Sequence, residues 1–250
     1  MSVPYFNYLI RHGLAVRARV AINGFVLVDG ESTLMNTHTG VANHYLVPGE
    51  NRLSVSCFGD PDHKSARLDA AIRDEDKVEL VSASWTERPA DGTELGPLGW
   101  HFHKVFTIPS TFPRPLYLAA PPAGIPEDGT PELADAVLEL RGAFERGDPS
   151  AAISLFELKS HDTHKMLETS WSEPSATEAL LGGALSGPWD MAPIHRRDLV
   201  FRTSCDDRLV HVSRASGDKV LQGNRRGQEK PSVASDLTFM RWQNRWRVIR

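Results

Sequence analysis

The sequence predicts two domains, an N-terminal all-β antiparallel sandwich and a C-terminal α+β domain whose helices pack on an antiparallel sheet. Three observations lead to this expectation. Short segments alternate between apolar and polar residues before residue 110, apolar residues at helical spacing follow residue 130, and a proline-rich stretch separates the two regions. We expect the sandwich-like domain at 1–110, a linker at 111–129 and the α+β domain at 130–250.

The composition narrows the class of protein. A chain of 250 residues, 40% of them hydrophobic, is long and apolar enough to bury a core. A formal net charge of −4 argues against a uniformly basic nucleic-acid binder. No apolar run approaches the roughly 18 residues that cross a bilayer, and Arg11, Arg17 and Arg19 interrupt any signal peptide. Two distant cysteines make no disulfide framework. We therefore expect a soluble, cytoplasmic protein with no membrane partner.

The N-terminal strands are marked by alternation and turn residues. Residues 16–22 alternate, Asn23-Gly24 suits a type I′ turn, and residues 25–28 complete a hairpin. Residues 45–47 and the alternating strand that follows flank a Pro48-Gly49 turn. On that strand Cys57 takes an inward position, which predicts a buried thiol. Further strands are expected at 77–85 and 101–108.

The linker and the helices follow. Seven of the 17 prolines lie between residues 109 and 131, which predicts an extended segment, with 116–120 at a sheet edge. Thr130-Pro131-Glu132 is typical of a helix start. An apolar stripe of four residues follows, Gly147 ends the helix, and Asp148-Pro149 begins the next. A third short helix is expected near 177–185. The stripe consists of Leu133, Val137, Leu140 and Phe144.

The last fifty residues return to strand periodicity. Residues 199–204 and 209–213 flank a four-residue turn, and 237–242 and 246–249 flank a three-residue turn. Helices followed by an antiparallel meander indicate an α+β fold.

Two segments carry a family resemblance. The run LRGAFERGDPSAA at 140–152 and the ending FMRWQNRWRVIR at 239–250 resemble the cone-shaped α+β superfamily of ketosteroid isomerase and nuclear transport factor two. The resemblance covers residues 130–250 and implies helices packed on a curved antiparallel sheet that encloses a pocket. It does not imply one function, because this superfamily contains isomerases, dehydratases and transport factors. We recognise no family for residues 1–110.

The resemblance implies candidate catalytic residues in such a pocket. An Asp base works there against an oxyanion hole in ketosteroid isomerase. Candidates here are Asp190, Asp206, Asp207, His195 and His211, none of which stands in a matching motif. The alternative is that Asp206 and Asp207 serve a turn and that His211 is an ordinary strand residue.

Metal-like spacings are present but incomplete. His161 and His164 could share a helix face, and His101 and His103 share a strand face. A zinc site needs three or four ligands, so an exposed helix end and a solvent-facing strand are the alternatives. We expect no metal and no cofactor.

Charge and apolar residues at the C-terminus suggest surfaces. Residues 195–250 hold 13 basic and 6 acidic side chains, a net +7, and residues 111–194 hold 5 and 13, a net −8. One interpretation is that acidic helices complement a basic sheet. The alternative is that Arg225, Arg226 and Lys230 form a basic loop for an acidic protein or, less favoured, nucleic acid. One face of the last hairpin carries three large apolar side chains, which would be exposed unless the first domain or a second subunit covers them. These are Met240, Trp242 and Ile249.

Two functions remain open from the sequence. The favoured one is a non-catalytic cytoplasmic binding protein with a protein partner or self-association, for example a bacterial accessory or toxin-neutralising (immunity) protein. The alternative is an isomerase- or dehydratase-type enzyme that binds a small molecule in the C-terminal pocket. The alternative requires an interior that is hollow and lined by a carboxylate or imidazole.

Overall fold

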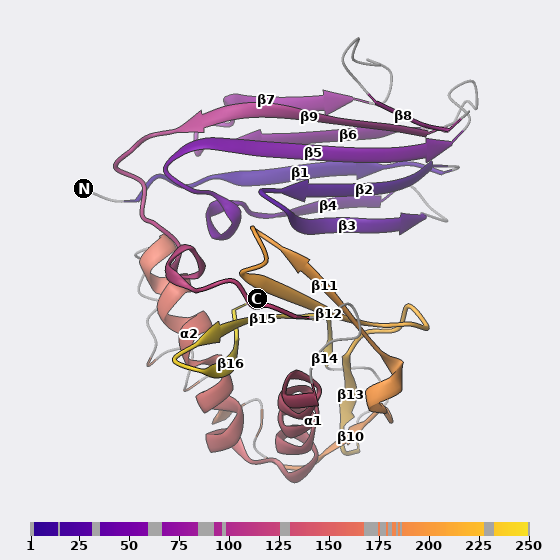
Figure 1. Cartoon of the computed structure of the whole chain (residues 1–250), viewed down its shortest axis with the longest axis vertical. Coiled ribbons are helices and arrows are strands. Elements are labelled where there is room, and N and C mark those ends of the chain that lie inside the picture. The colour runs from indigo at the N-terminus through magenta and orange to yellow at the C-terminus, as the bar shows by residue number, and fades with distance from the viewer. Residues whose placement is uncertain are drawn as a thin grey trace. The chain divides into compact units, whose positions relative to one another are not determined.

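The structure, a computed structural model, is rich in β-sheet, with four antiparallel sheets and two long α-helices among the described residues (Figure 1). It describes residues 3–14, 16–31, 36–59, 67–84, 93–96, 99–125, 131–167, 175, 179, 182–183, 185, 187–227 and 233–249. The chain forms two compact units, residues 1–115 and 116–250, which we call unit 1 and unit 2.

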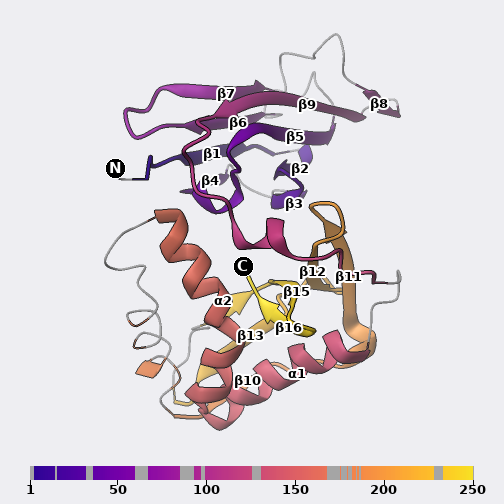
Figure 2. The same ribbon diagram turned by 60° about the vertical axis from the view of Figure 1, so that its left-hand side comes forward.

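The described residues of unit 1 form nine strands in two antiparallel sheets. The strands are β1 (Asn7–His12), β2 (Val16–Ile22), β3 (Phe25–Glu31), β4 (Asn36–Val41), β5 (Gly49–Gly59), β6 (Leu68–Arg73), β7 (Glu79–Ser84), β8 (Thr93–Gly96) and β9 (Gly99–Ile108). One sheet has the order β4-β1-β6-β7 and the other β3-β2-β5-β9-β8. Figures 1 and 2 show these sheets lying face to face with their strands aligned. Apolar side chains from both sheets fill the space between them, including Ile10, Val20, Ile22, Leu53, Val55, Ile72, Phe102 and Phe106.

The expected hairpin at Asn23-Gly24 is confirmed. Both residues have positive φ, 50° and 86°, and Ile22 pairs with Phe25 across the turn. Asn23 also accepts a hydrogen bond from Arg52 N, which ties the turn to the neighbouring strand β5. Cys57 is fully buried on β5, as its alternating position predicts.

The prediction of a strand at 45–47 is wrong. Residues Asn43–Tyr45 form a 3₁₀ turn, and the strand begins only at Gly49, whose φ is +89°. The buried Asn43 side chain explains the turn, because its Oδ1 accepts a hydrogen bond from Phe6 N and its Nδ2 donates to Pro4 O. These two bonds connect the turn to the N-terminal segment instead of to a partner strand.

Unit 2 begins with the two expected helices, α1 (Pro131–Arg146) and α2 (Pro149–Leu167). Gly147 separates them with a φ of +64°, and Asp148 Oδ1 accepts hydrogen bonds from Ser150 N and Ala151 N at the start of α2. The apolar stripe of α1 is buried, as predicted. The third helix, expected at 177–185, falls mostly outside the described residues.

In the described part of unit 2, seven strands follow the helices and form two antiparallel sheets. They are β10 (Trp189–Met191), β11 (Leu199–Ser204), β12 (Leu209–Arg214), β13 (Leu221–Arg225), β14 (Val233–Ser235), β15 (Leu237–Trp242) and β16 (Arg245–Val248). The orders are β10-β13-β14 and β11-β12-β15-β16. The second expected hairpin is confirmed with a two-residue turn, Gln243-Asn244, instead of three.

The two sheets of unit 2 are joined at a sharp bend. Val212 pairs with Leu237 and Leu221 pairs with Ser235, so residues 213–220 lie opposite the single residue Asp236. Lys219 bridges this bend, because its Nζ lies 2.6 Å from Asp236 Oδ2. Both helices contact β16, and Figure 2 shows α1 running beneath β15 and β16. Unit 2 therefore combines two leading helices with strands that change direction at Asp236.

The expected linker is structured where it is described. Residues Leu116–Ala119 form a 3₁₀ turn in place of a sheet edge, and Tyr117 is buried. Leu116 N donates to the buried Asp162 Oδ1 at 2.7 Å, and Arg208 Nε donates to Ala120 O at 3.1 Å. These contacts attach residues 116–123 to unit 2. Residues 126–130 lie outside the described residues.

Membrane-spanning helices are absent from the described part of the chain, since neither α1 nor α2 is both long and apolar enough to cross a bilayer.

Candidate functional site

The interior of unit 2 is filled by apolar side chains. Helix α1 contributes Leu133, Val137, Leu140 and Phe144 to one continuous core with the inner faces of the strands. Phe144 packs edge-on against Trp189, with ring centroids 5.6 Å apart. Strand residues of this core include Trp189, Met191, Leu199, Val210, Val212, Leu221, Leu237, Phe239 and Val248. A pocket for acid–base chemistry would need a carboxylate or an imidazole turned into a cavity. The fully buried carboxylate that the structure describes in unit 2, Asp162 of α2, instead accepts a hydrogen bond from Leu116 N.

His211 is a candidate catalytic residue whose imidazole lies between two side-chain hydroxyls. Its Nε2 lies 2.9 Å from Ser204 Oγ and its Nδ1 lies 2.9 Å from Thr238 Oγ1. Because Val210 and Val212 point into the core, His211 lies on the opposite face of β12. The two hydroxyls orient the imidazole across three neighbouring strands, and this ladder stabilises the sheet.

The other catalytic candidates are scattered over unit 2. Asp206 and Asp207 have positive φ in the β11–β12 turn, as expected for turn residues, and the Asp206 side chain is 97% exposed. His195 is exposed at the start of the 3₁₀ turn Arg196–Asp198, where its backbone N donates to Asp198 Oδ2. Asp190 points outward from β10 and forms an exposed ion pair with Arg226. The structure does not bring these groups together.

The histidine spacings behave as ordinary surface features. His161 is exposed on α2, and His164 is half-buried one turn later. His101 Nδ1 lies 2.8 Å from Ser56 Oγ, whereas His103 is exposed. Among the described residues, no three His, Cys, Asp or Glu side chains are grouped in a way that could hold a metal ion.

The residues of the predicted interaction surfaces differ in exposure. Met240 and Ile249 are fully buried, whereas Trp242 is half-buried. Arg225 is the last residue of strand β13, and Arg226, in the turn that follows, forms an exposed ion pair with Asp190. The third member, Lys230, lies outside the described residues.

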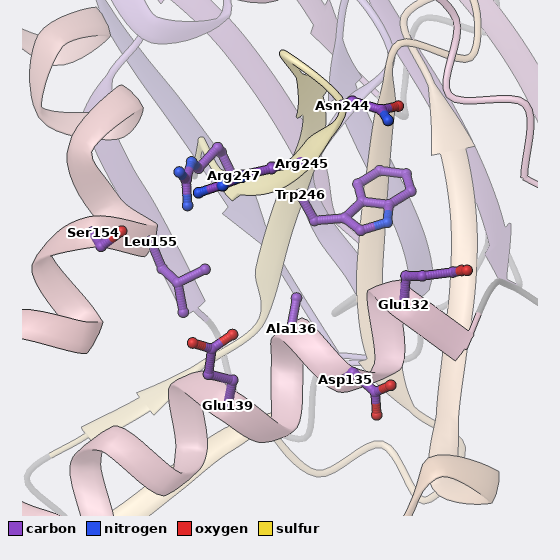
Figure 3. A pocket seen from close by; sticks show the side chains of 10 residues that line it. All are labelled: Glu132, Asp135, Ala136, Glu139, Ser154, Leu155, Asn244, Arg245, Trp246 and Arg247. Atoms are coloured by element: carbon purple, nitrogen blue, oxygen red, sulfur yellow. The ribbon is translucent and has the colours of Figure 1, made fainter.

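A cleft in unit 2 has side chains of opposite charge on its two walls (Figure 3). We call it the α1–β16 cleft; it has a volume of about 460 Å³. Its lining residues are Glu132, Asp135, Ala136 and Glu139 of α1, Ser154 and Leu155 of α2, Asn244 of the turn, and Arg245, Trp246 and Arg247 of β16. Ala136 and Leu155 are buried and give the cleft an apolar floor.

Charge in this cleft is only partly neutralised. Asp135 forms an ion pair with Arg196. Glu139, by contrast, forms no ion pair with Arg245 or Arg247 in the described structure, although all three line the same cleft. In Figure 3 Glu139 points into the cleft from α1, on the side where Arg247 enters from β16. The cleft therefore presents an acidic wall and a basic wall that do not meet.

A second groove lies at one edge of unit 1, which we call the β7–β9 groove. It has a volume of about 590 Å³ and is lined by residues 79–82 of β7 and 103–105 of β9. Val105 is 50% exposed in it, and Val78, which directly precedes the lining segment, is 58% exposed. Lys104 lies opposite the buried Leu53 on β5, so it sits on the core-facing side of its strand.

Sequence reasoning missed both of these sites. Alternation along 101–108 predicted the strand. It did not predict that the second half of this strand lies beside β7, because this proximity depends on how the two sheets pack. The α1–β16 cleft joins residues more than a hundred positions apart in the chain. The i, i+3, i+7 spacing of Glu132, Asp135 and Glu139 on α1 was the one available signal.

Comparisons with known protein families, with characterised proteins and with solved structures find no match to this chain.

Proposed function

We propose that this chain is a non-catalytic binding protein that holds a protein partner at the β7–β9 groove. The observation that carries the proposal is the exposure of Val105 in a groove of about 590 Å³, together with that of Val78, which directly precedes the lining segment of β7. They are the most exposed large apolar side chains of the described residues. Clustered apolar side chains on a protein surface commonly mark sites of protein–protein contact.

The edge position of β9 supports this choice of surface. Residues 102–108 pair with β5 on one side, and in the described structure no strand pairs with their other side. Such an edge offers free backbone groups to a partner, but a charged residue on the inward face opposes simple strand addition. Lys104 is such a residue. The partner in this proposal therefore contacts the groove mainly through side chains.

The positive charge of Lys104 indicates which charged group the partner would bring to the groove. Lys104 forms no ion pair within the described part of the chain, and His103 lies next to it in the groove. A carboxylate of the partner would neutralise the Lys104 ammonium while apolar side chains cover Val78 and Val105. This chemistry is consistent with an acidic, partly apolar segment of a protein, as in a toxin-neutralising complex.

The non-catalytic part of the proposal is supported by unit 2. The enzyme alternative requires a hollow polar interior, and the described interior is packed with Leu, Val, Phe and Trp side chains. The candidate acids and bases lie apart on the outside. The proposal also includes two domains, of which the second is cone-shaped. The resemblance of residues 130–250 supports this second domain.

Paired variants test the proposal by quantitative co-purification from a lysate of the native cells. Val78→Ser combined with Val105→Ser should reduce recovery of the specific partner at least tenfold. Leu118→Ser removes a comparable side chain, 39% exposed in unit 2, and should leave recovery unchanged. Equal recovery by wild type and the double variant would refute the β7–β9 groove as the docking surface.

A further inference from the structure

The α1–β16 cleft has the features of a ligand site separate from the β7–β9 groove. It belongs to unit 2, whereas the groove belongs to unit 1. Its volume of about 460 Å³ falls in the range of small-molecule sites, which is roughly 300–1,000 Å³. Its floor is apolar and its walls are charged, which is how such sites combine affinity with orientation.

The basic wall can bind a carboxylate. Arg245 and Arg247 are two residues apart on β16, so their side chains leave the strand on the same side. Figure 3 shows both guanidinium groups on the side of the cleft that faces α2. A guanidinium binds a carboxylate through two parallel hydrogen bonds, and neither arginine is paired with an acidic residue of the described structure.

The acidic wall can bind an ammonium group. Glu139 enters the cleft from α1, close to Leu155 on the floor. Asp135 is already neutralised by Arg196, which leaves Glu139 and Glu132 as the carboxylates available to a ligand. One ligand that carries both an ammonium and a carboxylate would therefore satisfy both walls at once.

The remaining lining residues select the ligand's side chain. Ala136 and Leu155 are buried at the floor, and the half-buried Trp246 points from β16 over α1. An apolar ligand side chain would gain contact area against Ala136 and Leu155. Trp246 leaves β16 on the face opposite to Arg245 and Arg247 and borders the cleft at its other end.

From this arrangement we propose that the α1–β16 cleft binds a free α-amino acid with an apolar side chain. The carboxylate lies against Arg245 and Arg247, the ammonium donates to Glu139, and the side chain packs on Ala136 and Leu155. The site adds a small-molecule ligand to the proposed protein-binding function and does not depend on it.

Three probes of the full chain test this proposal: L-phenylalanine, phenethylamine without the carboxylate, and 3-phenylpropanoate without the ammonium. The readout is the ¹⁵N indole resonance of Trp246, identified among the six tryptophans with Trp246→Phe. L-Phenylalanine should shift this resonance saturably. Each analogue should bind about tenfold or more weakly, since each lacks one charge-assisted contact.

Substitutions then test which wall of the cleft binds the ammonium and which binds the carboxylate. Glu139→Gln should weaken L-phenylalanine binding about tenfold and leave 3-phenylpropanoate unaffected. Arg245→Gln with Arg247→Gln should weaken L-phenylalanine in the same way and leave phenethylamine unaffected. Exposed control variants, Glu50→Gln and Arg197→Gln, should bind as the wild type does.

Three results would overturn the proposal: no saturable shift with L-phenylalanine, equal binding of all three probes, or wild-type affinity in the cleft variants. A dispersed amide spectrum for each variant establishes that it is folded. Because the readout is a residue of unit 2 and no partner protein is present, failure here leaves the co-purification result at the β7–β9 groove unaffected.

Discussion

Tyr8 lies directly opposite Gly40 across β1 and β4, and its phenol ring occupies the space that a side chain at position 40 would need. A Cβ built on Gly40 would lie 2.7 Å from the Tyr8 hydroxyl oxygen and 2.8 Å from the ring carbon Cε1. The glycine thus lets the ring lie flat across the edge strand. This contact connects a polar, half-exposed strand to the rest of its sheet.

Gly40→Ala should lower the free energy of unfolding by about 1–3 kcal/mol, because Tyr8 must move to admit the methyl group. Urea denaturation measures the effect. Gly182→Ala, at a site with open space around its Cα, is the matched control and should change little. If both variants unfold at the same urea concentration as the wild type, the packing of Tyr8 on Gly40 does not stabilise the sheet.

Tyr8 also makes the stability depend on alkaline pH. Burial raises the pKa of its phenol above the ordinary value of 10.0, and neighbouring Tyr45 raises it further. The folded chain therefore keeps this proton to higher pH than the unfolded chain. Its contribution to stability is full below about pH 10 and is lost as the pH rises above that, through the raised pKa of the folded chain.

Tyr8→Phe should remove part of this alkaline loss. The measurement is urea denaturation of wild type and variant at roughly pH 9 and roughly pH 11. The free energy of unfolding should fall more in the wild type than in Tyr8→Phe. An equal fall in both proteins would show that the Tyr8 phenol does not resist ionisation.

Asn51 is a buried amide whose hydrogen bonds all have partners. Only 2% of the surface of this residue is exposed. Its Oδ1 accepts from Val47 N and Asn23 Nδ2, and its Nδ2 donates to Val47 O and Gly49 O, at 2.8 to 2.9 Å. The amide thus fixes both the Pro48-Gly49 turn and the Asn23 hairpin.

Asn51→Leu should cost about 2–4 kcal/mol of unfolding free energy, since it leaves buried backbone groups without partners. Ser54→Ala on the same strand is the control and should stay within about 0.5 kcal/mol of the wild type. Thermal or urea denaturation compares the two. A Leu variant as stable as the Ala control would mean that water replaces the lost hydrogen bonds.

Gly223 tests the pairing of β10 with β13 in unit 2. It pairs with Met191, and a Cβ there would lie 2.9 Å from Asp190 O and 2.5 Å from Met191 Sδ. Gly223→Ala should destabilise unit 2 by about 1–3 kcal/mol and speed amide exchange in β10. Unchanged exchange at Met191 would contradict this close approach.

Local signals in the sequence predicted the elements that depend on few residues. Asn23-Gly24 adopts positive φ at both positions, so its hairpin follows from the turn alone. Likewise, Pro131 and Gly147 bound α1, and Asp148 caps α2. In each case one or two residues determine the backbone conformation, which is why the sequence was sufficient.

Elements that depend on distant partners were missed. Strand β4 has hardly any apolar alternation, because it is a largely exposed edge strand that pairs only with β1. Residues 45–47 look like a strand, yet the side chain of Asn43 ties them to the N-terminal segment. The candidate sites follow the same rule: the α1–β16 cleft and the β7–β9 groove each join segments whose proximity is set by tertiary packing.

The most direct test of the proposed function is photo-crosslinking in native cells from two positions. A benzoylphenylalanine at position 105 lies in the β7–β9 groove, and one at position 118 replaces an exposed leucine in unit 2. The proposal predicts one discrete crosslinked protein from position 105 and none from position 118. No adduct from position 105, or the same adducts from both positions, would contradict it.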